Sequence, residues 1–117
     1  MHTSLALFAF LALTALACSD STDSSSTNLC ANSGAAATVS ATDNYAFTPS
    51  SVTITVGQSV CWQNTGQLMH TVTENTIGRF NGNLPGGQTF VYTFTFNSSF
   101  VYHCNQHSNM VGTVTVN

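Results

Sequence analysis

The sequence predicts an all-β domain, a β-sandwich or barrel built from short strands. Three observations lead to this fold class. Apolar residues alternate with Thr and Ser at a period of two, as in residues 51–56, which read SVTITV. Gly, Pro, Asn and Ser interrupt the alternating runs at positions typical of turns. No segment after the N-terminal apolar run carries a convincing helical repeat.

The first 17 residues are typical of a secretory signal peptide. Residues 5–17 form an apolar run that is too short to span a bilayer, since a spanning helix needs about 20 residues. Ordinary signal peptidase would cut after Ala17. However, Leu16-Ala17-Cys18 is similar to a lipobox, in which Cys18 becomes the lipidated first residue. We expect the lipoprotein, with a plain secreted protein as the alternative.

Residues 18–28 follow as a tether. Residues 19–28 read SDSTDSSSTN, contain no apolar side chain and are typical of a flexible spacer. We therefore expect the folded domain in residues 29–117. Export would place it in the periplasm or cell envelope, an oxidising compartment in which disulfides persist.

Eight runs in the folded part are predicted to be strands. Turn signals separate them, for example Thr48-Pro49-Ser50, Asn64-Thr65-Gly66 and Pro85-Gly86-Gly87. In the sixth run, alternation predicts that four aromatic side chains face the core, namely Phe90, Tyr92, Phe94 and Phe96. The predicted strands are residues 36–42, 45–47, 51–56, 58–64, 69–74, 88–96, 99–104 and 110–116.

Charge is almost absent from the chain. It has one Lys or Arg and four Asp or Glu, so 4% of its residues are charged, against roughly a quarter in an average globular protein. One basic side chain is too few for a groove that binds nucleic acid or for a polybasic membrane patch, so both are excluded. With 18 Thr, 14 Ser and 11 Asn the surface is polar but uncharged. The chemistry must therefore come from His, Cys and Met.

The motif Cys104-x-x-His107-x-x-Met110 lies between two predicted strands. One short loop thus presents a thiolate, an imidazole and a thioether, a set that suits copper cycling between Cu(I) and Cu(II). His70, at the start of another predicted strand, is the candidate second imidazole of a His2Cys site with a weak axial Met. His103 would point to the opposite side from Cys104, either as an exposed polar residue or as a second point where electrons enter.

These residues give the folded part a resemblance to the cupredoxins, the small blue copper proteins. The short ligand loop, with two residues in each gap, is like that of amicyanin. The resemblance implies an eight-stranded Greek-key sandwich, one-electron transfer and one copper ion, with His70, Cys104, His107 and Met110 as ligands. It covers about residues 36–117, and the matching stretches are residues 47–49, 56–64, 69–72, 80–86 and 102–114.

The chain departs from the family pattern in two ways. Many members have Asn directly after the first histidine ligand, where it helps to hold the ligand loops together. This chain has Thr71, and the resemblance implies that its hydroxyl takes the same role more weakly, which affects the reduction potential. Docking surfaces in the family often carry charged residues, and this chain has almost none.

The expected function is that of a monomeric electron carrier rather than an enzyme. His107 should lie near the surface and offer the shortest path for an electron. Four apolar residues could surround it as a patch for brief encounters with a redox protein, although ordinary loop packing is the alternative; they are Leu68, Met69, Leu84 and Pro85. No nucleic-acid partner is expected, and membrane contact only through the lipid anchor.

Two cysteines remain once Cys104 is given to the metal and Cys18 to the lipid or tail. Cys30 and Cys61 would most simply form a disulfide in an oxidising compartment, and two free thiols are the alternative. Because Cys61 alternates with Val60 and Trp62, it should face away from the main core.

Other functions fit the motif less well. A cysteine–histidine hydrolase lacks any suggested substrate pocket, and structural zinc would not need Met110. Four protein ligands leave no open coordination position for a substrate. The serious alternative is a copper chaperone or storage protein, which the ligand set alone does not exclude.

Overall fold

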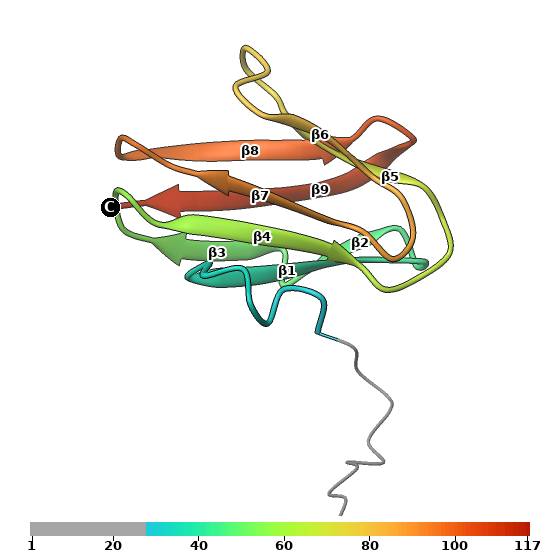
Figure 1. Ribbon diagram of the computed structural model, residues 1–117. Coiled ribbons are helices and arrows are strands. Elements are labelled where there is room, and N and C mark those ends of the chain that lie inside the picture. The colour runs from blue at the N-terminus through green and yellow to red at the C-terminus, as the bar shows by residue number, and fades with distance from the viewer. Residues whose placement is uncertain (1–27) are drawn as a thin grey trace, which may run out of the picture.

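The alternating runs form nine β-strands in two sheets (Figure 1). The computed structural model describes residues 28–117, and no helix occurs in that range. The all-β fold class is confirmed. The expected signal peptide (1–17), Cys18 and all but the last residue of the tether lie outside the described residues. The strands are β1 (Ala37–Thr42), β2 (Ala46–Thr48), β3 (Ser51–Ile54), β4 (Ser59–Asn64), β5 (His70–Glu74), β6 (Asn81–Leu84), β7 (Thr89–Thr93), β8 (Ser98–Cys104) and β9 (His107–Val116).

The topology brings four connections to one end of the sandwich. One sheet has the order β2-β1-β4-β7 and the other has the order β3-β9-β8-β5-β6. Strands β1 and β4 run parallel, as do β3 and β9, and the other pairs are antiparallel. As a result, the β1–β2, β4–β5, β6–β7 and β8–β9 connections all lie at the right-hand end in Figure 1, opposite the C-terminus. We call this the loop end.

Strand β6 was not predicted from the sequence. It reads NGNL, and only Gly82 and Leu84 face inward. The inward position of Gly82 is occupied by the neighbouring Phe90 ring, whose nearest carbon would lie 2.3 Å from a Cβ built on Gly82. A glycine that faces the core carries no hydrophobic signal, so the alternation is invisible in the sequence.

The predicted strands differ from the observed ones by one or two residues at their ends, and in two cases by three residues. Strand β9 begins at His107 rather than Met110, and β7 ends at Thr93 rather than residue 96. Phe94 is still buried beyond the end of β7, but Phe96 is 40% exposed, so the prediction that it faces the core is wrong. Once the chain leaves the pleat after Thr93, alternation no longer sets the direction of the side chain. The Arg79 guanidinium lies 4.7 Å from the centre of the Phe96 ring.

The core is built around Trp62 on β4, which is fully buried. Its ring centre lies 5.3 Å from that of Tyr102 on β8, 5.6 Å from that of Phe80 and 5.8 Å from that of Phe90. Aromatic pairs at such distances each contribute about 0.5–1.5 kcal/mol beyond the area they bury. Since Trp62 and Tyr102 come from different sheets, their contact fixes the two layers against each other.

Three charged side chains occur in residues 28–117, and one of them is buried. Burial alone would raise the pKa of Glu74, but the backbone N–H groups of Thr76, Ile77 and Arg79 donate to its carboxylate at 3.0–3.1 Å and lower the pKa to about 2. Glu74 therefore orders the β5–β6 connection while ionised.

No helix in the described residues is long and apolar enough to cross a membrane.

The N-terminal segment is attached to β4 by a disulfide between Cys30 and Cys61. Both cysteines are buried, yet neither belongs to the main core cluster, which agrees with Cys61 facing away from that core. The Leu29 and Cys30 N–H groups both donate to Oε1 of Gln63, at 2.8 and 3.3 Å. The bond and these contacts hold residues 28–36 against the outside of the sandwich.

Removing this disulfide should destabilise the domain. The bond closes a loop with a sequence separation of 31 residues, for which the chain-entropy model gives about 3–4 kcal/mol. We expect the double variant Cys30→Ala/Cys61→Ala to lose free energy of unfolding by about this amount in urea denaturation. Cys18→Ala is the matched control and should leave the midpoint unchanged. A double variant as stable as the parent would contradict the structural role.

Candidate metal centre

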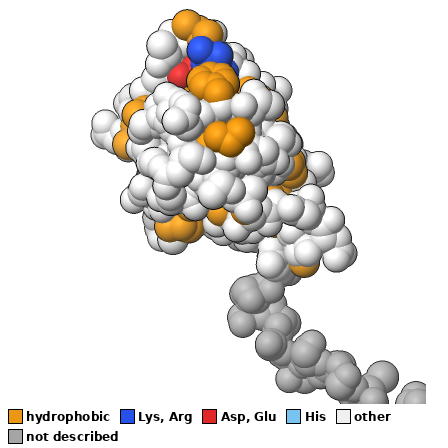
Figure 2. Space-filling view, turned by 90° about the vertical axis from the view of Figure 1, so that its left-hand side faces the viewer, with side chains coloured by type: hydrophobic (Ala, Val, Ile, Leu, Met, Phe, Trp, Pro, Cys, Tyr) orange, Lys and Arg blue, Asp and Glu red, His pale blue; other side chains and the backbone are white. Residues whose placement is uncertain are grey.

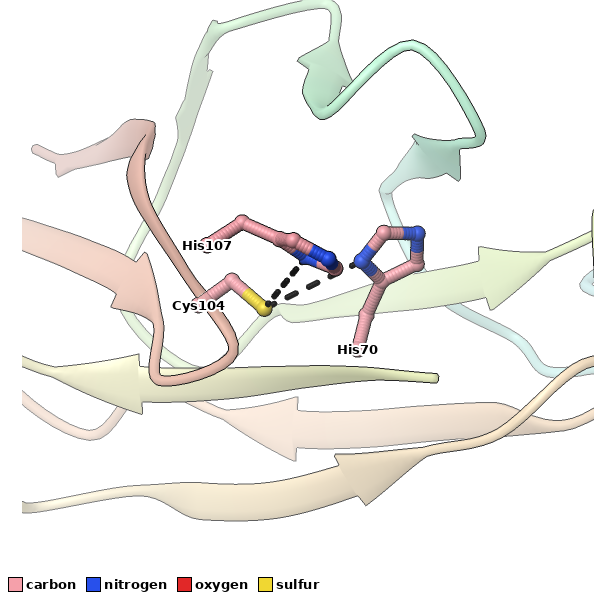
Figure 3. Close-up of side chains that lie close together, drawn as sticks. All are labelled: His70, Cys104 and His107. Atoms are coloured by element: carbon pink, nitrogen blue, oxygen red, sulfur yellow. Dashed lines mark hydrogen bonds between the residues drawn. The ribbon is translucent and has the colours of Figure 1, made fainter. Parts of the chain in front are cut away.

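Three side chains from three strands meet at the loop end (Figure 3). They are His70 at the start of β5, Cys104 at the end of β8 and His107 at the start of β9. Their potential ligand atoms all lie within 4.8 Å of one another. His70 and Cys104 are fully buried, and His107 is half-buried. One edge of the site is therefore open to solvent, at His107.

The distances around the sulfur fit a bound metal ion. The Sγ atom of Cys104 lies 3.8 Å from Nδ1 of His70 and 3.6 Å from Nδ1 of His107. Metal–nitrogen and metal–sulfur bonds of about 2.0 and 2.3 Å, as known for zinc, span about 3.7 Å when they meet at about 120°. Both imidazoles also turn the same nitrogen, Nδ1, toward the sulfur, as Figure 3 shows. This donor set fits a metal with a preference for soft and borderline ligands.

The sulfur lies where the pairing of β5 with β8 comes to an end. The last residues that pair between these two strands are Thr73 and His103. The pairing of β8 with its other neighbour, β9, is irregular between His103 and Cys104. Beyond His103, hydrogen bonds that involve side chains replace the backbone pairing of β5 with β8. The Thr71 N–H donates to Cys104 Sγ at 3.3 Å, and the Asn105 N–H donates to Thr71 Oγ1 at 2.8 Å. Thr71 therefore joins the two ligand-bearing segments through its hydroxyl, as the resemblance implied.

The environment of His70 favours the neutral imidazole. Burial is the largest cause that lowers its pKa, and the nearby His107 lowers it further. A neutral ring is the form that can bind a metal. Within the described residues, His70 Nε2 is buried without a hydrogen bond that meets normal geometry, although the backbone of Thr42 is close enough to oppose the fall in the pKa.

Met110 is fully buried on β9, three residues beyond His107. It belongs to the main hydrophobic cluster together with Cys104. A buried thioether at this position suits the axial role that the motif predicts.

Two polar residues organise the loops around these ligands. The Asn64 side chain at the end of β4 donates to the carbonyls of Leu68 and Leu84 and accepts from Gly66 N–H, at 2.7–2.9 Å. The Asp43 carboxylate in the β1–β2 turn accepts the N–H groups of Gln67 and Leu68 at 3.0–3.1 Å. The Leu68 and Gln67 bonds lower the pKa of Asp43. The β4–β5 connection, which leads into His70, is thus fixed from both sides.

The predicted apolar patch is only partly at the surface. Met69 is 40% exposed, Pro85 is exposed and Leu68 is half-buried. Leu84 is fully buried in the core cluster, so its predicted docking role is wrong. It is an inward residue of β6, the strand that the sequence pattern did not reveal.

The sequence did not reveal that Tyr45 and Asp43 belong to this site. Tyr45, predicted to start a strand, lies in the β1–β2 turn with its ring centre 4.6 Å from that of His107. Asp43-Asn44 is a turn signal, but nothing in the sequence links this turn to a residue 62 positions away.

His103 lies on the other side of β8 from Cys104 and is half-buried. Its Nδ1 lies 2.5 Å from Oδ1 of Asn75, and its Nε2 lies 2.8 Å from Oδ1 of Asn105. The expected orientation, opposite to the ligand cysteine, is therefore seen. The ring joins the β5–β6 connection to the ligand loop.

Comparison with known proteins agrees with this geometry. The family model of copper-binding proteins of the plastocyanin/azurin family matches residues 34–117. The chain belongs to this family, which confirms the resemblance to cupredoxins and implies one bound copper ion. No curated protein sequence matches the chain significantly.

Solved cupredoxin structures share the fold. A purple cupredoxin from Nitrosopumilus maritimus is 26% identical with a TM-score of 0.65, and the match covers 69% of this chain and 99% of that one. The Cu(I) form of an amicyanin variant is 27% identical with a TM-score of 0.64, and the match covers 72% of this chain and 83% of amicyanin.

Replacing Thr71 tests the link between the two ligand-bearing segments. Thr71→Val keeps the shape of the side chain but removes the acceptor of the part-buried bond from the Asn105 N–H, which costs about 1 kcal/mol. We expect lower stability of the apo-protein and a shifted charge-transfer band of the copper form. Thr71→Ser retains the hydroxyl and should stay close to the parent in both measurements. If valine and serine behave alike, the hydroxyl bond does not hold the loop.

Proposed function

We propose that this protein is an exported, mononuclear type 1 copper protein that carries single electrons between redox partners. The observation that carries the proposal is the arrangement of two histidine Nδ1 atoms around one buried cysteine sulfur, 3.6 and 3.8 Å from it, within a domain of the plastocyanin/azurin family. His70, Cys104 and His107 are the proposed equatorial ligands and Met110 the axial one. Bound copper supplies the Cu(I)/Cu(II) couple.

The surrounding fold supports electron transfer because it holds the ligands in place. Thr71 N–H fixes the Cys104 sulfur, and a hydrogen bond to a thiolate also withdraws charge from it and so tunes the reduction potential. Asn64 fixes the connection before His70. A site whose ligands stay near one arrangement in both oxidation states loses little energy to rearrangement on each transfer.

His107 is the proposed point where electrons enter and leave. It is the one member of the three-residue cluster that is not fully buried. The apolar surface beside it comprises Met69 and Pro85, with Leu68 half-buried between the loops. We propose that a redox protein docks here briefly and that the chain acts as a monomer. The opposite end of the sandwich faces the viewer in Figure 2. The single basic side chain of the sequence, Arg79, lies there and not beside His107.

Export is part of the proposal. A buried disulfide between Cys30 and Cys61 needs an oxidising compartment to form and persist. Together with the predicted signal peptide and the lipobox-like Cys18, this supports a periplasmic or cell-envelope location, with a tether to the membrane through a lipid.

The optical spectrum of the copper-loaded protein tests the proposed site. We expect an intense thiolate-to-copper absorption at about 600 nm on adding Cu(II), bleached by a reductant and restored by an oxidant. Cys104→Ser should abolish the band. The double variant Cys30→Ala/Cys61→Ala removes two sulfurs that lie outside the site and should retain the band. A protein that binds only Cu(I) and shows no such band would favour the chaperone or storage alternative.

The reaction with a redox partner should depend weakly on salt. With one basic and two acidic side chains in residues 28–117, there is little long-range steering of the encounter. We expect the bimolecular rate constant to change less than about threefold between 10 mM and 300 mM ionic strength, across which the Debye length falls from about 30 to 6 Å. Stopped-flow mixing with a physiological oxidant would measure it, and a steep slope would contradict an apolar docking surface.

A further inference from the structure

An aromatic ring from a distant turn packs beside His107. Tyr45 lies between β1 and β2, and its ring centre is 4.6 Å from that of His107, with an angle of 51° between the planes. The other ring beside His107 is that of His70, at 5.1 Å. Tyr45 is 54% exposed, so its contact with His107 is not a by-product of core packing.

The backbone of Tyr45 has an unusual conformation for its residue type. Its φ angle is +61°, and it is the only non-glycine residue with a positive φ in the described part of the chain. Bulky side chains avoid this left-handed region, and residues held there cluster at functional sites. The turn is closed by the Tyr45 N–H, which donates to the Thr42 carbonyl at 3.1 Å. The left-handed conformation therefore sits at the position whose ring faces the proposed ligand.

Asp43, two residues earlier, joins this turn to the β4–β5 connection. Its carboxylate accepts the N–H groups of Gln67 and Leu68. Gly66 permits the close approach, because a Cβ at that position would lie 2.2 Å from Oδ1 of Asp43. The carboxylate thus fixes the turn that carries Tyr45 relative to the segment that leads into His70.

His107 needs such support because it begins β9 directly after the ligand loop. In the described residues, its only side-chain hydrogen-bonding contact is the one between Nδ1 and Cys104 Sγ. An open recess of about 230 Å³ lies beside it, lined by Tyr45, His107, Ser108 and Asn109. Without the Tyr45 ring, one wall of this recess would be missing and the imidazole could turn away from the sulfur.

We propose that Tyr45 is a positioning residue for His107, held in place by Asp43. The ring of Tyr45 keeps the imidazole in the orientation in which Nδ1 faces Cys104, and it slows the departure of copper along the exposed side. This inference rests on the proposed ligand role of His107. It assigns to the β1–β2 turn a part in metal retention that neither the motif nor the family match provides.

Copper release separates this role from a merely structural one. We expect Tyr45→Gly to transfer Cu(I) to a chromogenic chelator about threefold to tenfold faster than the parent, the range that corresponds to one aromatic pair. Tyr45→Phe keeps the ring and is the matched control, with release at the parental rate. Because glycine adopts positive φ freely, the apo form of Tyr45→Gly should be as stable as the parent or more stable.

Apo-protein NMR provides a readout without copper. The Tyr45 ring should shift the imidazole C–H resonances of His107, and the shift should disappear in Tyr45→Gly and persist in Tyr45→Phe. A parental release rate in Tyr45→Gly, or His107 resonances unchanged by loss of the ring, would overturn the proposal. A parent that takes up no copper would overturn the proposed function, while the apo-protein resonances would still decide the ring contact.

The role of Asp43 is tested by a double-mutant cycle. Asp43→Ala should speed Cu(I) release in the parent by a smaller factor than Tyr45→Gly does. In the Tyr45→Gly background its effect should be smaller than in the parent, because part of the role of Asp43 runs through the turn that carries the ring. The effect that remains reports its bonds to the segment before His70. Independent, multiplicative effects of the two substitutions would show that Asp43 does not act through Tyr45.

Discussion

The metal centre depends on the point where strands β5 and β8 stop pairing. Had the ladder continued past Thr73 and His103, backbone groups would have filled the space between His70 and Cys104. Instead the strands part, and two hydrogen bonds through the Thr71 N–H and hydroxyl replace the ladder. The opening is wide enough for an ion yet fully closed to water at His70 and Cys104. The end of the β5–β8 ladder at His103 therefore makes a binding site from two ordinary strands, and the pairing of β8 with β9 is also irregular at this point.

The rest of the sandwich keeps this opening from collapsing or widening. Tyr102, two residues before Cys104, packs its ring against Trp62 of the other sheet, and its hydroxyl lies where a side chain at Gly112 would clash. The position of Cys104 is thus set by the packing of Tyr102 in the core rather than by the conformation of a loop. On the outer side of β4, the disulfide at Cys61 attaches the N-terminal segment to the same strand that holds Trp62. Rigid support from both sheet layers suits a centre that must change charge without changing shape.

How much of this could be predicted depended on whether the signal was local in sequence. The proposed ligands could be found because three of them fall within seven residues and the fourth, His70, is a histidine at the start of another predicted strand. The all-β class followed from alternation, and the choice of a sandwich over a barrel followed from the resemblance to cupredoxins. Strand β6 and the burial of Leu84 could not be found, because Gly82 faces the core without any hydrophobic signal. Tyr45 and Asp43 could not be found either, since their partners lie 62 and about 24 residues away and only the tertiary fold joins them.

The low charge of the chain takes on a specific meaning at the loop end. Among the described residues, Asp43 provides the only side-chain carboxylate at the loop end. This carboxylate accepts two backbone N–H groups of the β4–β5 connection instead of facing a partner. Glu74 is likewise bonded to its own loop, and Arg79 lies over an aromatic ring. Each of the three charges in residues 28–117 therefore has an intramolecular use. If a redox partner docks at His107 as proposed, the side chains that it meets there are Met69, Pro85 and Tyr45. Tyr45, the residue proposed to hold His107, would thus also contact a docking protein. A substitution of Tyr45 would therefore affect both metal retention and partner contact.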